Sequence, residues 1–297
     1  MSATNNPQPS DDVVDVGAAT QGSIEVAPTR DRDLIRRLID ADRAIAAHAL
    51  ADLDPGELPR TRCYVARRGG EAIALGMEYS GWAPQPLHLF GEPIGVAAIL
   101  EVGIRPRAAW VPTPIGGDPI LDLRYETEKV NPMLRMAVDR GSFRRYMGDA
   151  TRLVVPLVPA DSGALNRLYQ LGFAAWLPPL AVAEGVYRGI HRDGRLVAAA
   201  GTHVIGRGER IAVLGNVLTA AGSRGNGYAR ATTSAVTEAL LDFCDDVVLN
   251  VRSDNSVAIR LYQSLGYSVR AEFEERLVVR RSALALPRLL RRIFGGV

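Results

Sequence analysis

The sequence has little of several residue types that would point to a particular class of protein. Only two of its 297 residues are cysteine, and Cys63 and Cys244 lie far apart and match no metal-binding spacing. The four histidines do not cluster either, so the sequence predicts no metal site. The net charge is only +2, which gives no reason to expect a nucleic-acid partner.

Long apolar runs are missing as well. No stretch of about 18 apolar residues occurs, so no membrane span and no membrane partner are expected. The N-terminus is polar and acidic, unlike a signal peptide. We therefore expect a cytoplasmic protein in which both cysteines are reduced thiols of the core. Lysine is almost absent, since Lys129 is the only one.

The most informative segment that is present runs from Leu218 to Ala229. It follows an apolar run (211–217) and precedes a helix-like run (229–244). Gly225 and Gly227 permit a positive φ and leave no side chain in the way. The N–H groups of residues 225–229 would then point at one spot, at the positive end of the helix dipole. This strand, loop and helix predict a pyrophosphate-binding nest.

Three kinds of phosphate loop can be compared with this segment. The P-loop needs a lysine that is not there. The dinucleotide fingerprint needs a third glycine where Arg230 stands, and the acids at 245–246 precede the next strand instead of following it. The third pattern, Arg-x-x-Gly-x-Ala, is complete at Arg224, Gly227 and Ala229.

Hydrophobic periodicity and turn signals predict an α/β (α+β) protein. Helices are expected at 31–53, 130–138, 229–244 and 254–265. Strands are expected at 63–66, 72–79, 96–102, 153–158, 186–190, 195–204, 211–219, 247–251, 267–269 and 276–279.

Two segments of the chain are similar to each other. Residues 161–173 parallel residues 254–267, and in both an Asp precedes a Tyr by eight positions and a Gly-aromatic pair follows. The shared order predicts a tandem duplication. Only the second half contains the glycine loop.

Residues from about 186 to 279 resemble the GNAT superfamily of acyl-CoA-dependent N-acyltransferases. The resemblance rests on the loop 224–229 and on Asn255-x-x-Ala258-x-x-x-Tyr262 followed by the Leu-Gly-Tyr of 265–267. It implies two tandem acyltransferase-like halves, each a mixed, mostly antiparallel twisted sheet flanked by helices. The expected domains are a disordered tail (1–23), a degenerate N-terminal domain (24–175), a catalytic domain (176–282) and a basic C-terminal segment (283–297).

The resemblance also implies a reaction and a site. Acetyl-CoA would be the cosubstrate, without a metal, and its acetyl group would pass directly to a primary amine of a small-molecule or peptide acceptor. Tyr262 would protonate the departing thiolate, and main-chain groups of Val217 and Thr219 would contact the pantetheine arm and the acyl carbonyl. Asn255 would either contact the CoA arm or only cap its helix. The pyrophosphate ligands would be Arg224, Gly225, Asn226, Gly227, Tyr228 and Ala229.

The sequence departs from the family at the general base. Some members carry a glutamate on the strand before the loop, but residues 214–217 contain no acid. A water chain, His203, Asn216 or Glu275 are the alternatives. The missing acid also motivates a second hypothesis, a catalytically silent CoA-binding regulatory or scaffold module. Neither the acceptor nor the oligomeric state follows from the sequence.

Overall fold

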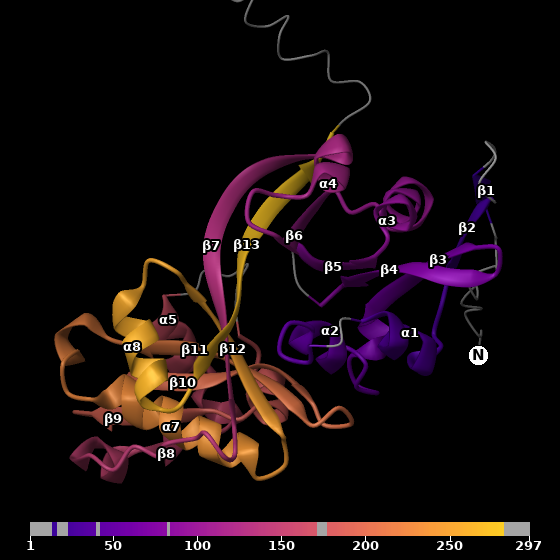
Figure 1. The fold of residues 1–297 in the computed structure, drawn as a ribbon. Coiled ribbons are helices and arrows are strands. Elements are labelled where there is room, and N and C mark those ends of the chain that lie inside the picture. The colour runs from indigo at the N-terminus through magenta and orange to yellow at the C-terminus, as the bar shows by residue number, and fades with distance from the viewer. Residues whose placement is uncertain (1–13, 17–22, 40–41, 82–83, 171–176, 282–297) are drawn as a thin grey trace, which may run out of the picture. The chain divides into compact units, whose positions relative to one another are not determined.

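The computed structural model describes residues 14–16, 23–39, 42–81, 84–170 and 177–281 (Figure 1). The chain forms two compact units: unit 1 contains 1–39, 60–131 and 274–297, and unit 2 contains 40–59 and 132–273. This division does not coincide with the predicted boundary between residues 175 and 176. Of the predicted tail only residues 14–16 and 23 are described, and the segment 283–297 lies outside the described residues.

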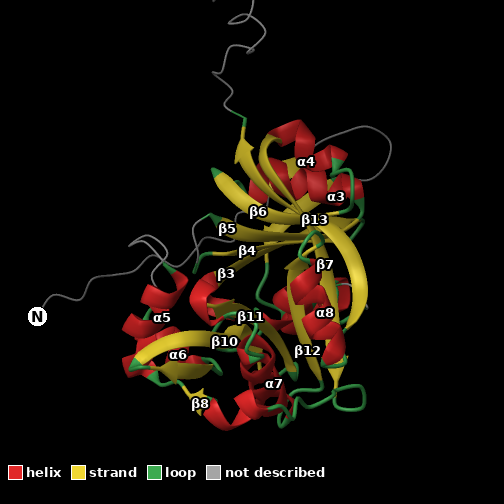
Figure 2. Cartoon of the chain, turned by 90° about the vertical axis from the view of Figure 1, so that its left-hand side faces the viewer, coloured by secondary structure: helices red, strands yellow, loops and turns green. Residues whose placement is uncertain are grey.

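Unit 1 is a mostly antiparallel sheet with helices packed on it. Its strand order is β1-β2-β3-β4-β5-β6-β13, and β5 and β6 are the parallel pair. Its strands are β1 (Val14–Val16), β2 (Ile24–Pro28), β3 (Thr61–Arg68), β4 (Glu71–Tyr79), β5 (Gln85–Gly91), β6 (Ala108–Thr113), the start of β7 (Tyr125–Asp139) and the end of β13 (Ser268–Arg280). Its helices are α1 (Arg32–Leu38), α3 (Pro93–Ala98), the π-helix η2 (Ile99–Gly103) and α4 (Pro119–Arg124). The helices α3 and α4 lie together (Figure 2), and Ile99, Leu100 and Leu121 join the core with Ala74 and Val111.

Unit 2 has a second mixed sheet. Its strand order is β7-β12-β11-β10-β9-β8, with β11 and β12 as the parallel pair. Besides parts of β7 and β13, its strands are β8 (Val155–Pro156), β9 (Arg188–Arg192), β10 (Arg195–Gly206), β11 (Ile211–Thr219) and β12 (Asp246–Arg252). Its helices are α2 (Ala47–Ala51), α5 (Ser162–Tyr169), α6 (Pro179–Glu184), α7 (Tyr228–Leu241) and α8 (Ser256–Ser264). Short 3-10 turns are η1 (Leu58–Arg60), η3 (Asp149–Leu153), η4 (Pro159–Asp161) and η6 (Ala221–Ser223).

The helices of unit 2 cover both faces of its sheet. Ala198 and Ala199 are neighbours on β10, so their side chains point to opposite faces. Ala199 packs with Leu165 of α5, whereas Ala198 packs with Ala231 of α7. The helix α5 therefore lies on one face and α7 on the other.

The order of elements occurs twice along the chain. From β2 to β7, and again from β8 to β13, it is one strand, two helices, three strands, a helix, a strand, a helix and a strand. The parallel pair has the same place in both series. The last strand of each series pairs with a strand of the other series: β7 pairs with β12, and β13 pairs with β6. This order aligns α8 with α4, whereas the sequence similarity paired α8 with α5, a helix of the same unit.

Two predicted elements are wrong. Residues 96–102 form α3 and η2 instead of a strand, because Pro93 suits the first turn of a helix and the apolar residues bury one side. Residues 130–138 belong to β7 instead of a helix, because Met133 to Asp139 pair with β12 and bury Met136 and Val138. The predicted helix 31–53 is divided into α1 and α2.

The cysteines are buried and form no disulfide, Cys63 in unit 1 and Cys244 in unit 2. No helix in the described part of the chain is long and apolar enough to cross a bilayer.

Gly266 ends α8 and lies against the backbone of Ser142, so replacing it tests how the end of α8 packs. Its φ is 96°, and an added Cβ would lie 2.0 Å from the carbonyl oxygen of Ser142. We expect Gly266→Ala to lower the free energy of unfolding by about 1–3 kcal/mol from the backbone strain alone, with the clash adding to this cost. Urea unfolding measures the change. Gly222→Ala is the control, because nothing lies within 4 Å of its Cβ position; equal stability of the two variants would contradict the packing.

Candidate functional site

The loop between β11 and α7 has the backbone that the sequence predicts. Gly225 has a φ of 81° and Gly227, the N-cap of α7, has a φ of 74°, so the predicted positive φ is confirmed at both. No side chain caps α7, and no described residue accepts a hydrogen bond from the N–H groups of 225–229. These amides stand at the positive end of the helix dipole, which suits them to an anion. We name residues 225–229 the amide cradle.

Side chains brace the amide cradle without filling it. The Asn226 amide donates to the carbonyl oxygens of Ser223 at 3.1 Å and Arg224 at 3.2 Å. The Arg224 Nε donates to the Thr219 carbonyl oxygen at 3.4 Å. A Cβ at Gly225 would meet nothing within 4 Å, so the space beside the loop is open.

Gly227 is more constrained than Gly225. A Cβ there would lie 2.7 Å from the Tyr146 hydroxyl, which adds a close contact to the positive φ. The guanidinium of Arg230 stacks over the ring of Tyr146, 5.5 Å from its centroid. Arg230 therefore packs on an aromatic ring.

The strand β11 separates from its parallel neighbour just before the loop. Pairing with β12 ends at Leu214 and Leu249, and Asn216 has a φ of 53°. Residues 217–219 therefore present an edge that is not paired with β12. The Thr219 hydroxyl oxygen is buried and has no hydrogen-bond partner among the described residues. Such a group favours a ligand beside this edge.

A tyrosine of α5 holds the irregular residue of β11. The Tyr169 hydroxyl donates to the Asn216 carbonyl oxygen at 2.6 Å. The Asn216 side-chain amide donates to the Tyr187 hydroxyl at 3.2 Å and to the Thr202 carbonyl oxygen at 3.3 Å. Burial raises the pKa of Tyr169 and raises that of Tyr187 to about 12, so both stay protonated donors at neutral pH. Sequence reasoning treated Tyr169 only as a repeat of Tyr262 and missed this role.

Tyr262 lies on α8 in the same apolar cluster as Val217. It is 7% exposed, and its ring meets the edge of Tyr267 at 5.9 Å between centroids. Its hydroxyl has no hydrogen-bond partner among the described residues, whereas the Tyr267 hydroxyl pairs with Thr237 at 2.8 Å. Burial raises the pKa of Tyr262 to about 12, which keeps it protonated. Tyr262 thus provides the site with a protonated hydroxyl that donates no hydrogen bond to another described residue.

Asn255 caps α8, because its side-chain oxygen accepts from the Ala258 N–H at 3.1 Å. This bears out one of the two roles predicted for it. A contact with a CoA arm stays a prediction.

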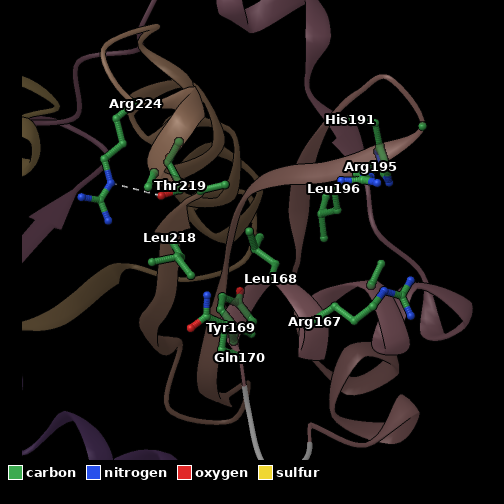
Figure 3. A pocket seen from close by; sticks show the side chains of 14 residues that line it. Arg167, Leu168, Tyr169, Gln170, His191, Arg195, Leu196, Leu218, Thr219 and Arg224 are labelled. Carbon is green, nitrogen blue, oxygen red and sulfur yellow. Dashed lines mark hydrogen bonds between the residues drawn. The ribbon is translucent and has the colours of Figure 1, made fainter.

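A cavity of about 770 Å³ opens at the end of β11. Thr219 and Arg224 line it from the strand and the loop, and Tyr169 lines it from α5 (Figure 3). The cavity therefore begins at the residues predicted to hold the cosubstrate and extends along the face that α5 covers.

Among the candidates for a base, His203 on β10 lies against β11. A Cβ at Gly215 would be 2.3 Å from the His203 Nε2, so glycine leaves the room for this imidazole. The Asn216 side chain is already bonded to Tyr187 and Thr202. Within the described residues no group of three or more His, Cys, Asp or Glu side chains could hold a metal ion.

Comparison with known proteins agrees with this geometry. The model of the acetyltransferase (GNAT) family matches residues 159–267. The fold is similar to a GNAT-family structure from Novosphingobium aromaticivorans, with 19% identity, a TM-score of 0.57, and coverage of 79% of this chain and 96% of that one. It is also similar to a GCN5-related N-acetyltransferase from Sphaerobacter thermophilus, with 16% identity, a TM-score of 0.55, and coverage of 87% and 95%.

A third similar structure is a tandem GNAT protein from the clavulanic acid biosynthesis pathway, with 14% identity, a TM-score of 0.53, and coverage of 86% of this chain and 98% of that one. No curated protein matches the sequence. At these identities the solved structures show the fold.

The hydrogen bond from Tyr169 can be tested directly. We expect Tyr169→Phe to lower the free energy of unfolding by about 1–2 kcal/mol, because the Asn216 carbonyl loses its donor in a partly buried place. Denaturant unfolding measures the change. Tyr228→Phe is the matched control, since no described residue bonds its hydroxyl, and it should stay within about 0.5 kcal/mol of the parent. An equal loss in both variants would rule out a special role for Tyr169.

Proposed function

We propose that the chain transfers an acetyl group from acetyl-CoA directly to a primary amine, a proposal supported by the match of residues 159–267 to the model of the acetyltransferase (GNAT) family. The observation that carries the proposal is the amide cradle at the start of α7, with its unpaired N–H groups, beside the unpaired edge of β11. Acetyl-CoA supplies an acyl carbon that is activated as a thioester. The acceptor is a small-molecule or peptide amine.

The chain's own groups have three binding tasks. The N–H groups of residues 225–229 bind the diphosphate, as backbone amides at a helix N-terminus do. Main-chain groups of Val217 and Thr219 on the open edge of β11 hold the pantetheine arm. The buried Thr219 hydroxyl is a further polar group with no partner of its own among the described residues. Donors on this edge also stabilise the charge that develops on the acyl oxygen.

Proton transfer completes the reaction. The amine nitrogen bonds to the acyl carbon, the carbon–sulfur bond breaks, and Tyr262 gives its proton to the sulfur. The amine gives one proton to His203, the imidazole of β10 that lies against Gly215 of β11. Tyr262 suits its task because its hydroxyl is protonated and not used elsewhere in the described structure.

Replacing Tyr262 tests the chemistry. We expect Tyr262→Phe to lower kcat about 10- to 10⁴-fold, the range of a lost general acid, with little change in the Kd for CoA. Steady-state kinetics and calorimetry give the two values. Tyr267→Phe removes the neighbouring hydroxyl and should retain most of kcat. A fully active Tyr262→Phe enzyme would remove this residue from the mechanism.

Replacing Gly227 tests the amide cradle. We expect Gly227→Val to abolish detectable CoA binding, because a β-branched side chain neither fits beside Tyr146 nor adopts the positive φ without strain. Calorimetric titration with CoA measures this, and circular dichroism verifies folding. Gly222→Ala should bind CoA normally. Unchanged affinity in Gly227→Val would contradict the cradle, and tight CoA binding by the parent without transfer to any amine would favour a silent CoA-binding module.

A further inference from the structure

The cavity at the end of β11 is lined by basic side chains and by no acidic one. Arg167 comes from α5, His191 from β9, Arg195 from β10 and Arg224 from the loop, and no described lining residue is Asp or Glu. None of the three arginines forms an ion pair with any other described residue. The one acid of the hairpin, Asp193, lies in its turn and does not line the cavity. A cavity lined by one sign of charge concentrates ligands of the opposite sign.

The basic side chains are grouped. Figure 3 shows Arg167, His191 and Arg195 on one side of the cavity and Arg224 on the other. The helix α5 and the β9–β10 hairpin, which are separate in the sequence, thus bring two guanidinium groups and an imidazole to the same cavity. Arginine presents several donors in a planar fork that matches a carboxylate or a phosphate. We name Arg167, His191 and Arg195 the basic trio.

The basic trio lies away from the amide cradle. The cradle begins α7, which packs against Ala198 of β10, whereas Arg167 belongs to α5, which packs on the side of Ala199. Leu196, which is opposite His191 in the β9–β10 pair, packs in the cluster of α5. The amides of residues 225–229 therefore serve one face of the sheet, and Arg167 and His191 lie on the other. Arg195, at the start of β10, lines the same cavity.

We propose that this cavity binds the acceptor amine, and that the acceptor carries an anionic group, a carboxylate or a phosphate, which Arg167, His191 and Arg195 hold. This proposal rests on the proposed acetyl transfer, because it gives that reaction its substrate class. The cavity joins the trio to Leu218 and Thr219, so a bound molecule reaches from its anionic group to the open edge of β11. The amine end is then beside the strand that holds the acyl group.

Pairs of amines that differ only in the anion test the proposal. We expect kcat/KM to be at least tenfold higher for 4-aminobutyrate than for butylamine, or for 2-aminoethyl phosphate than for ethanolamine. Arg167→Gln and Arg195→Gln should raise the KM of the anionic member about tenfold, as the loss of a charge-assisted hydrogen bond does, and should leave the uncharged member unchanged. Arg192→Gln is the matched control, since it lies on the same hairpin outside the cavity. No preference for the anionic amines, or equal effects of Arg192→Gln and Arg195→Gln, would overturn the proposal.

Two further measurements distinguish this proposal from two alternatives: that the basic trio binds a phosphate of CoA, and that the proposed acetyl transfer does not occur. The Kd of each variant for CoA and for 3′-dephospho-CoA shows whether the trio holds a phosphate of the cosubstrate; a loss in Arg195→Gln for CoA alone would overturn the acceptor assignment. Binding of 4-aminobutyrate to the parent protein with and without saturating CoA, followed by NMR, does not depend on turnover. A parent that binds 4-aminobutyrate through Arg195 but binds no CoA would refute the proposed acetyl transfer and leave the anion site standing.

Discussion

The separation of β11 from β12 is the constraint on which the rest of the site depends. A parallel pair normally continues its ladder, and an unpaired backbone edge next to a core is costly. Here the pairing stops at Leu214, and the positive φ of Asn216 turns the strand away. Tyr169 and Tyr187 stabilise this irregular residue from the face that α5 covers. The strain at one residue thus yields an open edge that leads directly into the glycine loop.

Both halves have the same order of elements, so the glycine loop of the second half can be compared with the corresponding segment of the first half. The place that corresponds to the glycine loop is the junction of β5 and α3. There Gly91 is tightly packed, since a Cβ would lie 2.2 Å from the carbonyl oxygen of Ile73. The helix begins with Glu92 and Pro93, so one N–H is missing and a carboxylate, paired with Arg68, stands where an anion would bind. These residues explain physically why the junction of β5 and α3 does not form an anion cradle.

The sequence predicted the local backbone of the candidate site better than it predicted the architecture. The glycine loop and α8 could be found because local rules determine them: positive φ selects glycine, and Asn255 caps a helix within three residues. The strand 130–138 was missed because its pairing with β12 joins residues more than 100 positions apart. The exchange of β7 and β13 was missed for the same reason, because local sequence patterns do not determine which strands pair with each other. The role of Tyr169 depends on Asn216, a residue 47 positions away.

Burial sets the proton chemistry that Tyr262 can perform. A phenol with a pKa of about 12 would give its proton to an ordinary thiolate, whose pKa is about 8.5, only with a cost of roughly 5 kcal/mol. The same apolar surroundings act on sulfur, however: in this unit burial raises the pKa of the Cys244 thiol to about 11. A thiolate leaving beside Tyr262 would be desolvated in a similar way, and a gap of one pKa unit costs only about 1.4 kcal/mol. The apolar cluster that Tyr262 shares with Val217 therefore opposes proton donation less than the raised pKa of the phenol alone would, because burial raises the pKa of the sulfur together with that of the phenol.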